Sequence, residues 1–465
     1  MPKNNFKNRK KELALFEELC NSGKSKLIIF YGRRRVGKTE LLKEFLSKHK
    51  GLYLLARQES EKEQLVKFST QISEFFKDNV LKVNPFISWD ALFTYLFEKP
   101  RMPIIFDEFP YAVQASKKLP SILQDYWDNK FSKNKSFIVL CGSSINIMEN
   151  LLGHKSPLYG RRTEQILLEP LKFSDACLFF PDKMPLKEKV IYYSLLGGIP
   201  AYLLEFDFNK SLKENLKENL LRKNKFLYQD TMFVLKEELK EPRNYFSILD
   251  SVAKGNTKIG LIVNDTGLEK SFVNKYLSVL ISLQLVERRV PITEKDNRKS
   301  RKGLYFIKDN FFKSWFKFIF GNQEYVEQDR QDKLIKEKII PELNSFAGRA
   351  FEDIVLSEII RNRKYENYLF GRWWDKNSEA DIVGIDKEKK EIIIGEVKFS
   401  KLSKRDIAGI EKSLKEKSKI INIMGFKEKF IIICLDHQDY KIDATDTDIT
   451  DIKIIKFKDL MSNSN

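Results

Sequence analysis

The sequence predicts an α/β protein that begins with a parallel sheet covered by helices on both faces and ends with a smaller α/β domain. In the first half of the chain, buried β-branched or aromatic runs alternate with segments of helical period. A glycine-rich loop joins the first of these runs to a helix. Near the C-terminus, two apolar runs at 380–385 and 391–399 flank the charged turn DKEKK, which indicates a hairpin.

Length and composition describe a globular chain of several domains. Its 465 residues suffice for about two to four domains. Hydrophobic residues at 42% and aromatic residues at 12% exclude a disordered chain. The formal net charge of +18 is compatible with an acidic partner such as nucleic acid, although a lysine-rich composition has the same balance without such a partner.

Cysteine spacing and the apolar runs bear on the compartment. The four cysteines lie far apart and form no C-x-x-C pair, which argues against structural zinc and a disulfide framework. The N-terminal segment 1–13 is charged and has no apolar core, unlike a signal peptide. The longest uncharged run, VIYYSLLGGIPAYLL at 190–204, is too short and interrupted to span a bilayer. We therefore expect a cytoplasmic protein with no membrane partner.

The segment YGRRRVGKTELL, residues 31–42, predicts a phosphate-binding loop. The run KLIIF before it is typical of a buried strand, and the residues from Thr39 onward are helix formers. Gly32, Gly37, Lys38 and Thr39 match G-x-x-x-x-G-K-[ST] without a mismatch. In the context of strand, loop and helix, this pattern indicates nucleotide binding.

Each part of the loop has an expected role. Backbone N–H groups would curve around the β- and γ-phosphates, Lys38 would reach the terminal phosphates, and the Thr39 hydroxyl would bind Mg²⁺. The arginines either add charge toward the nucleotide or face water, and both options remain open. The residues assigned to nucleotide binding in this loop are Gly32, Arg33, Arg34, Arg35, Val36, Gly37, Lys38 and Thr39.

A second set of polar residues is expected at the ends of neighbouring strands. Asp107 and Glu108 follow the apolar run 104–106. Asp107 would hold Mg²⁺ through water, and Glu108 would orient or deprotonate the attacking water. Ser143 and Ser144 follow another strand, 136–142, where either serine would contact the γ-phosphate or the catalytic water, or cap the next helix.

This order of parts resembles the AAA+-like P-loop ATPases, and more narrowly the archaeal and bacterial ATPases grouped with the STAND signalling NTPases. The motifs that carry the resemblance are FKNRKKEL (6–13), IIFDEFP (104–110), GSS (142–144), SPLYGRRT (156–163) and GGIPAYL (197–203). The resemblance implies an ATPase domain over 1–235 that binds ATP, with Asn8 and Arg9 near the adenine. It further implies that Arg161 or Arg162 senses the γ-phosphate and that 197–203 belongs to a helical lid.

The middle of the chain, 240–325, predicts a winged helix-turn-helix. Helices at 244–253 and near 259–264, a third starting at Ser271, and two strands around a basic tip at 295–302 follow in that order. Lys270, Asn274 and Lys275 would meet DNA phosphates, or the domain would pack on protein; both readings stay open. The aromatic segment FFKSWFKFIF, 311–320, is expected to form the core of a docking helix rather than a stacking platform.

The last part, 340–465, carries acidic residues on the predicted hairpin. Glu396 and Lys398 share one side of their strand, and Asp381 lies at the start of the paired strand, an arrangement able to hold a divalent metal. It resembles the PD-(D/E)XK nuclease superfamily, with Ala380 in place of the motif's proline. The resemblance implies Asp381 and Glu396 as Mg²⁺ or Mn²⁺ ligands, Lys398 as the residue that aligns water, and Glu352 as a further acid.

Three functions are consistent with these parts. The first is an ATP-driven molecular switch that controls a metal-dependent nuclease acting on DNA or RNA. The second keeps the ATPase but makes the C-terminal domain a sensor that binds nucleic acid or protein without cleaving. The third is a scaffold that assembles with protein partners or with copies of itself and uses nucleotide only for its conformation.

Overall fold

The computed structural model describes residues 6–239, 241–421, 423–438 and 452–462, and these form two compact units. Unit 1 is the described part of Met1–Pro170 together with Ile199–Ala201. Unit 2 comprises Leu171–Gly198 and the described part of Tyr202–Asn465. The division therefore falls earlier in the chain than the expected boundary at 235, which stays a prediction.

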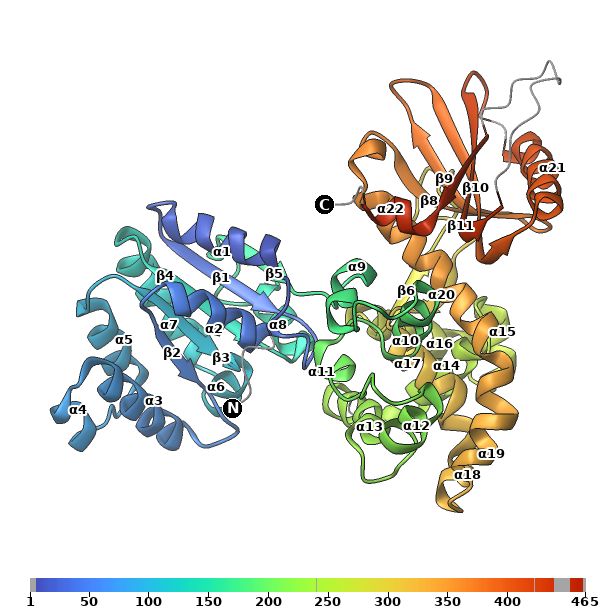
Figure 1. Ribbon diagram of the computed structural model, residues 1–465. Coiled ribbons are helices and arrows are strands. Elements are labelled where there is room, and N and C mark those ends of the chain that lie inside the picture. The colour runs from blue at the N-terminus through green and yellow to red at the C-terminus, as the bar shows by residue number, and fades with distance from the viewer. Residues whose placement is uncertain (1–5, 240, 422, 439–451, 463–465) are drawn as a thin grey trace. The chain divides into compact units, whose positions relative to one another are not determined.

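Unit 1 is built on a five-stranded parallel sheet with the order β2-β3-β4-β1-β5 (Figure 1). The continuous apolar runs became strands as predicted, whereas β5, which is short and half-buried, was not predicted. Because all five strands are parallel, their carboxyl ends lie along one edge of the sheet. The strands are β1 (Lys26–Tyr31), β2 (Leu52–Leu55), β3 (Pro103–Asp107), β4 (Phe137–Gly142) and β5 (Glu164–Leu167).

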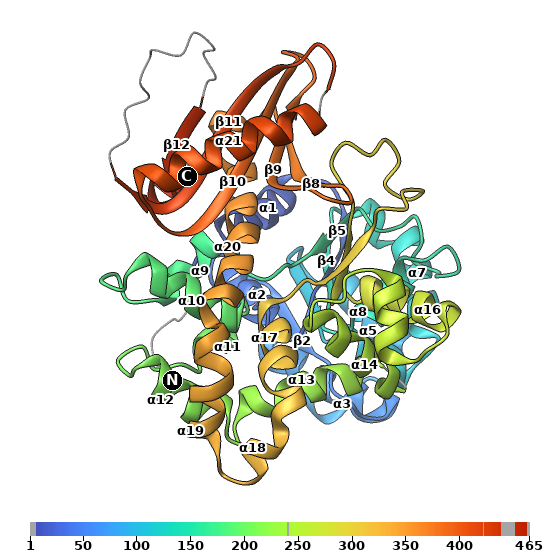
Figure 2. The ribbon, with the colours of Figure 1, turned by 90° about the vertical axis from the view of Figure 1, so that its right-hand side faces the viewer.

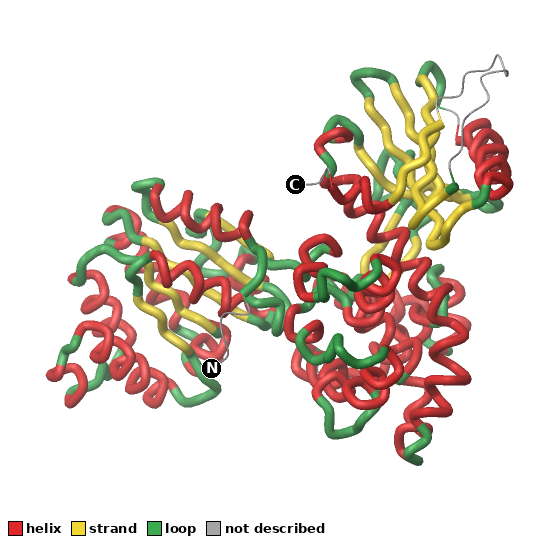
Figure 3. Tube along the Cα trace, viewed as in Figure 1, coloured by secondary structure: helices red, strands yellow, loops and turns green. Residues whose placement is uncertain are grey.

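Helices cover both faces of this sheet (Figure 3). On one face, Phe16 and Phe45 from two helices pack against the strand residue Phe30 in one buried cluster. On the other face, the rings of Phe68 and Phe93 lie 6.0 and 6.2 Å from that of Phe106. The helices are α1 (Lys10–Asn21), α2 (Lys38–Lys48), α3 (Glu61–Phe76), α4 (Asn79–Val83), α5 (Trp89–Glu98), α6 (Phe109–Ala115), α7 (Leu119–Asn129) and α8 (Ile145–Leu152).

The first part of unit 2 is helical, and it contains the predicted series of three helices followed by an antiparallel strand pair, α14–α16 and β6–β7. The aromatic helix α17 is buried in this part, where Trp315 donates its Nε1–H to Tyr228 O, so its expected role as a packing element is confirmed. The elements are α9 (Phe173–Ala176), α10 (Leu186–Leu196), α11 (Pro200–Leu203), α12 (Leu212–Asn215), α13 (Phe226–Glu238), α14 (Pro242–Ala253), α15 (Ile259–Thr266), α16 (Lys270–Ser282), β6 (Val286–Arg289), β7 (Leu304–Ile307), α17 (Asn310–Phe318), α18 (Gln323–Glu327) and α19 (Gln331–Leu334).

The second part of unit 2 is a mixed five-stranded sheet with the order β12-β11-β10-β9-β8. The predicted hairpin is confirmed as the antiparallel pair β9–β10, in which Val383 lies opposite Ile394. Apolar residues of α20 and α22 pack on one face and those of α21 on the other, and α20 also packs along α10 (Figure 2). The elements are α20 (Ile340–Arg361), β8 (Leu369–Trp374), β9 (Glu379–Asp386), β10 (Glu391–Leu402), α21 (Lys404–Ile421), β11 (Lys427–His437), β12 (Ile452–Lys456) and α22 (Phe457–Ser462).

Across the described part of the chain, none of the helices combines the length and the apolar character that a bilayer-spanning segment requires.

Candidate nucleotide site and acidic site

The glycine-rich loop lies between the carboxyl end of β1 and the start of α2, as predicted. A side chain at position 32 would collide with the carbonyl oxygen of Leu168, so only glycine fits there. Gly37, directly before α2, has a φ of 100°, a conformation that residues with a Cβ rarely adopt. Both glycines of the motif are therefore required by the backbone path of the loop.

Lys38 is buried inside this loop. Its Nζ donates to the carbonyl oxygens of Gly32 and Arg33, at 2.8 and 3.0 Å. Burial lowers the pKa of Lys38, although the nearby Cys141, Glu108 and Asp107 act in the opposite direction. The cation that is expected to meet the terminal phosphates is thus held at the loop by two backbone carbonyls.

Thr39 and Asp107, the two expected Mg²⁺ contacts, lie together. The Thr39 hydroxyl donates to Asp107 Oδ2 at 2.7 Å, and the Tyr53 hydroxyl donates to the same oxygen at 2.5 Å. Asp107 is buried at the end of β3. Tyr53 on the neighbouring strand β2 was not predicted, because nothing in its local sequence marks it out. These contacts orient the Asp107 carboxylate toward the start of α2.

Glu108 and Ser143 form a second pair at the same edge of the sheet. The Ser143 hydroxyl donates to Glu108 Oε2 at 2.8 Å, and the Ser143 backbone N–H lies 3.3 Å from that oxygen. Glu108 has a left-handed backbone, with φ 51° and ψ 40°, which is uncommon for a residue other than glycine. Such strain often occurs at functional sites. The Ser143 hydroxyl is therefore engaged by Glu108, and its contact with the γ-phosphate or the catalytic water stays a prediction.

The three arginines of the loop differ in exposure. Arg33 is buried, Arg34 is exposed to solvent, and Arg35 is half-buried with a left-handed φ of 68°. Arg34 therefore matches the reading in which an arginine faces water. Arg33 is enclosed within the loop.

Arg9 ties the segment before α1 to the phosphate loop. Its Nη2 donates to Val36 O at 3.0 Å and to Glu169 O at 2.8 Å, and its Nη1 pairs with Glu12 at 3.0 Å. Arg9 and the preceding Asn8 both have positive φ values. The contact to the loop brings this segment to the nucleotide site, while proximity to an adenine stays a prediction.

Arg161 and Arg162 lie directly before β5, in a segment that runs beside the start of β1. The adjacent Thr163 bonds to Leu27 at the start of β1, and Gly32 is five residues farther along, roughly 16 Å at about 3.3 Å per residue. Arg161 pairs with Asp128 through Nη2 at 2.8 Å. Arg162 also interacts electrostatically with Tyr31, the residue directly before Gly32. A role of Arg161 or Arg162 in sensing the γ-phosphate therefore stays a prediction.

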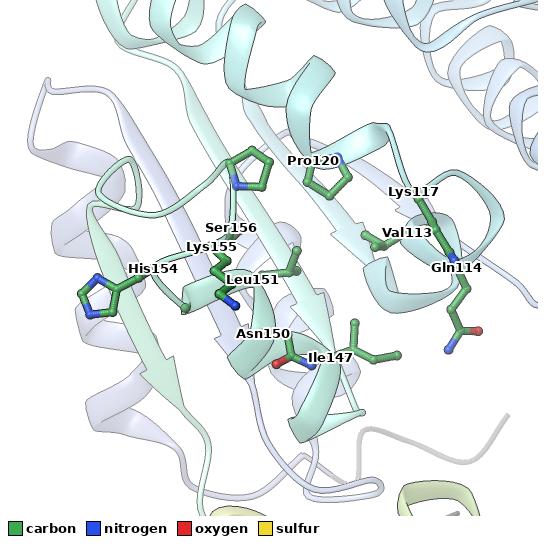
Figure 4. A pocket seen from close by; sticks show the side chains of 12 residues that line it. Val113, Gln114, Lys117, Pro120, Ile147, Asn150, Leu151, His154, Lys155 and Ser156 are labelled. Atoms are coloured by element: carbon green, nitrogen blue, oxygen red, sulfur yellow. The ribbon is translucent and has the colours of Figure 1, made fainter.

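A cavity of about 580 Å³ lies in unit 1 between α6, the start of α7, α8 and the following loop. Figure 4 shows Val113, Leu151 and Ile147 gathered around this hollow and His154 at its outer side. None of the residues predicted for nucleotide binding lines it. We therefore assign this cavity no part in the nucleotide site.

The segment GGIPAYL, 197–203, crosses between the two units. Its residues Ile199–Ala201 belong to unit 1, where Pro200 lies beside Gly37 of the phosphate loop. Gly198 belongs to unit 2, where a side chain would collide with Leu171 and where its carbonyl accepts from Leu171 N at 2.8 Å. Pro200, which lies next to the phosphate loop, is thus only two residues along the chain from Gly198, which packs tightly in unit 2.

The predicted acids of the hairpin converge in unit 2. Asp381 is buried and accepts a hydrogen bond from Val397 N at 2.8 Å. Each oxygen of Glu396 accepts a hydrogen bond from a lysine, Oε1 from Lys398 and Oε2 from Lys417, both at 2.7 Å. Lys417 comes from α21 and was not predicted, because its sequence neighbours only indicate an amphipathic helix. Burial raises the pKa of Asp381 to about 7, with the negative charges of Glu396 and Glu352 adding to the effect.

Glu352 is held by a chain of ion pairs that begins on the β6 strand. Arg372 donates to Glu352 Oε2 at 2.6 Å and to Asp353 Oδ1 at 2.8 Å, and Arg289 of β6 donates to the same Asp353 oxygen at 2.7 Å. Burial raises the pKa of Asp353, but Arg289 and Arg372 outweigh it and hold that pKa well below its usual range. The expected fourth member of the acidic site is therefore present but paired with arginine.

The chemistry of the acidic cluster suits a divalent cation in part. Carboxylate oxygens are the ligands that Mg²⁺ prefers. The raised pKa of Asp381 reflects burial first and then the negative charges of Glu396 and Glu352, which a bound cation would offset. Within the described residues, however, no three acidic, histidine or cysteine side chains are arranged as a metal centre. The chemistry of Asp381 and Glu396 fits, and metal binding stays a prediction. A cavity of about 570 Å³, lined in part by Glu396, Lys398 and Arg405, opens beside them.

Asp381→Asn is expected to stabilise the chain at pH 8 by about 1–4 kcal/mol and to have little effect at about pH 3.5, below the pKa of the unfolded chain. Because the pKa of Asp381 is raised to about 7, the folded chain keeps a proton that the unfolded chain releases above about pH 4. Stability therefore falls as pH rises from about 4 to 7, and the neutral amide removes this loss. Denaturant unfolding with a metal chelator measures the effect, with the exposed Glu379→Gln as control. Equal stability of Asp381→Asn and wild type at pH 8 would contradict it.

The loop with its lysine, the threonine bonded to an aspartate, and the following glutamate define a P-loop ATPase domain. Residues 6–206 match an ATPase domain family found predominantly in Archaea, and residues 315–410 match a domain of archaeal and bacterial proteins of unknown function. An uncharacterised protein of Methanocaldococcus jannaschii is 33% identical over 439 residues, covering 92% of this chain and 95% of the relative. The chain therefore belongs to the same family as this protein, with an ATPase domain of the predominantly archaeal type.

Two further similarities agree with this assignment. An uncharacterised ATP-binding protein of Methanocaldococcus jannaschii is 58% identical over 45 residues, which are 10% of this chain and 76% of the relative. The Walker-type ATPase of Pyrococcus abyssi has a similar structure, with a TM-score of 0.52 and 22% identity over 68% of this chain and 97% of that one. At this identity the structural likeness supports the fold alone.

Proposed function

We propose that this protein is an ATP-hydrolysing molecular switch whose second unit carries a nuclease-like site acting on DNA or RNA. The observation that carries the proposal is the convergence of Lys38, Thr39, Asp107 and Glu108 at one edge of the unit 1 sheet. Together they cover phosphate binding, Mg²⁺ binding and activation of water, and each is positioned by a hydrogen bond or by a strand end.

In this proposal the loop N–H groups and Lys38 bind the phosphates of ATP. Thr39 and Asp107 would hold Mg²⁺, which supplies charge neutralisation on the phosphate oxygens. Glu108 orients the attacking water and accepts its proton, and Ser143 fixes the Glu108 carboxylate by donating to Oε2. The second hydrogen bond of Glu108, from its own N–H to Asp107 Oδ1 at 2.9 Å, couples the two acids.

The segment around Pro200 is the proposed link between nucleotide and unit 2. Pro200 lies beside Gly37, and the residues on both sides of Ile199–Ala201 belong to unit 2. A bound phosphate that changes the loop would therefore act on a segment whose ends are fixed in the other unit. For a switch, the two nucleotide states must differ in free energy by a few kcal/mol.

In unit 2, Asp381 and Glu396 are the proposed holders of Mg²⁺ or Mn²⁺, which would supply an acidified water and neutralise the scissile phosphate. Lys398 would align that water, and Lys417 orients the Glu396 carboxylate by donating to its Oε2. Exposed Lys270, Asn274 and Lys275 on α16 support nucleic-acid contact by the proposed winged helix.

A regulator or scaffold that does not cleave is the second candidate. It is favoured by the ion pairs that engage both oxygens of Glu396 and one oxygen of Glu352, since a metal would have to displace them.

The deciding experiment compares wild type with Glu396→Ala in Mn²⁺ and ATP, using plasmid, single-stranded DNA and RNA as substrates. We expect wild type to cleave at least one of them and Glu396→Ala to lose about 10²–10⁴-fold of that rate, because a metal ligand is missing. Glu428→Ala, an exposed acid on β11, is the matched control and should cleave like wild type. Hydrolysis of ATP without cleavage of any substrate would reject the nuclease and leave the regulator.

A further inference from the structure

A basic cleft lies within unit 2, between the helices α15 and α16, the tip of the β6–β7 hairpin and the turn between β8 and β9. Its volume is about 1130 Å³. Figure 2 shows the hairpin tip beside the end of β8, and Trp374 of β8 donates its Nε1–H to Lys302 O at 3.2 Å. Among the described residues, its lining carries one acidic side chain, Asp375, and six cationic ones: Lys258, Lys270, Arg288, Arg301, Lys302 and Lys376.

Most of this positive charge is not neutralised by the protein. Lys302 pairs with Glu294 at 2.9 Å, and Arg288 donates to the carbonyl oxygens of Asn297 and Ser300, which braces the hairpin tip. The other four cations, Lys258, Lys270, Arg301 and Lys376, are exposed and form no ion pair with any residue that the structure describes. They come from four separate places, the start of α15, the start of α16, the β6–β7 loop and the β8–β9 turn. Their convergence is therefore a product of the fold and not of a local charge run.

Two aromatic side chains complete the cleft. Trp374 is half-buried and held by its hydrogen bond to Lys302, and Tyr305 of β7 is buried in the wall. A fixed indole beside several cations offers both a surface on which a base stacks and charges that contact the flanking phosphates. A duplex keeps its bases stacked inside and would not place one in a hollow of this size.

We propose that this cleft binds single-stranded nucleic acid, with phosphates on Lys258, Arg301 and Lys376 and a base against Trp374. This proposal rests on the proposed function in one respect, that the partner is a nucleic acid. It adds a site that uses the β8–β9 turn, which lies outside the winged helix. The turn leads directly into β9, where Asp381 lies four residues after Asn377, roughly 13 Å along the strand. A strand held in the cleft thus lies near the proposed cleavage site.

Binding to the full-length protein tests the proposal, measured by fluorescence anisotropy without ATP or divalent metal, so that neither enzymatic activity is required. The probes are oligo-dT and oligo-rU of about twelve nucleotides, within the range that one binding module covers. A duplex of equal length and polyglutamate serve as competing ligands. We expect a single strand to bind more tightly than either, and the comparison of the two oligonucleotides separates DNA from RNA.

The triple variant Lys258→Ala, Arg301→Ala, Lys376→Ala should weaken binding at least tenfold and reduce the salt slope by about 2, at about 0.7 per lost phosphate contact. Trp374→Ala should weaken binding about fivefold or more without changing the salt slope. Trp374→Phe keeps an aromatic ring and should therefore retain most of the wild-type affinity. The matched control replaces three exposed lysines outside the cleft with alanine: Lys223, Lys336 and Lys338. This control variant should lose less affinity than the cleft variant. Unchanged melting temperatures exclude unfolding.

The proposal is overturned if the cleft variant and the control variant lose affinity equally, because the binding would then reflect net charge alone. It is also overturned if polyglutamate competes as well as the single strand, which would make the cleft a site for acidic peptides. Preferential binding of the duplex that survives the change at Trp374 would equally contradict it.

Discussion

Glu108→Gln is expected to keep ATP bound while hydrolysis slows by about 10²–10⁴-fold. The amide keeps the shape of the side chain and still accepts a hydrogen bond from Ser143, but it does not take a proton from water. Because Glu108 has a left-handed backbone held between β3 and α6, the substitution leaves its position unchanged. Phosphate release and binding of a fluorescent ATP analogue measure the two effects separately.

Glu98→Gln, an exposed acid at the end of α5, is the matched control and should hydrolyse ATP like wild type. Ser143→Ala should slow hydrolysis less than Glu108→Gln, since it removes only the group that orients the carboxylate. If Glu108→Gln abolished ATP binding instead, Glu108 would be a structural or Mg²⁺-binding residue, and its assignment as the base would be wrong.

Lys38→Ala should lose about 10²–10³-fold in ATP turnover, the scale on which loss of a single charge-stabilising donor acts. ATP binding should weaken as well, because the ammonium group lies at the loop that would hold the phosphates. Lys38 also donates hydrogen bonds to the carbonyl oxygens of Gly32 and Arg33. Where water does not replace these bonds, the substitution costs about 1–3 kcal/mol in the free energy of unfolding.

Lys43→Ala is the control for this change, since Lys43 is exposed on the same helix and pairs with the equally exposed Glu40 at 3.5 Å. Melting temperature and nucleotide binding are to be measured on both variants. A folded Lys38→Ala protein with unchanged ATP turnover would remove the phosphate-loop assignment altogether.

Local sequence signals predicted much of this site. The loop motif, the strand β1 and the helix α2 are contiguous in sequence, so they required no knowledge of the fold. The contact of Thr39 with Asp107 followed from one further rule, that parallel strands end at a common edge. The β9–β10 hairpin was equally local, since the two runs and their turn are adjacent.

The missed residues depend on contacts between distant segments. β5 has only two apolar residues, Ile166 and Leu167, after two polar ones, so its own sequence does not mark it as a strand. Lys417 reaches Glu396 only because α21 folds back over β10, and Arg372 reaches Glu352 across two elements. Such pairings depend on tertiary packing, which short-range patterns do not encode.

Hydrogen exchange of the backbone in residues 186–203 tests the central claim, that the nucleotide state of unit 1 acts on unit 2. It is to be compared between Glu108→Gln loaded with ATP and Lys38→Ala in the same ATP concentration. The account predicts exchange rates that differ several-fold in this segment, because Pro200 lies beside the phosphate loop and its flanking residues belong to unit 2. Identical exchange in the two proteins, with ATP bound only to the first, would mean that the two units are merely tethered.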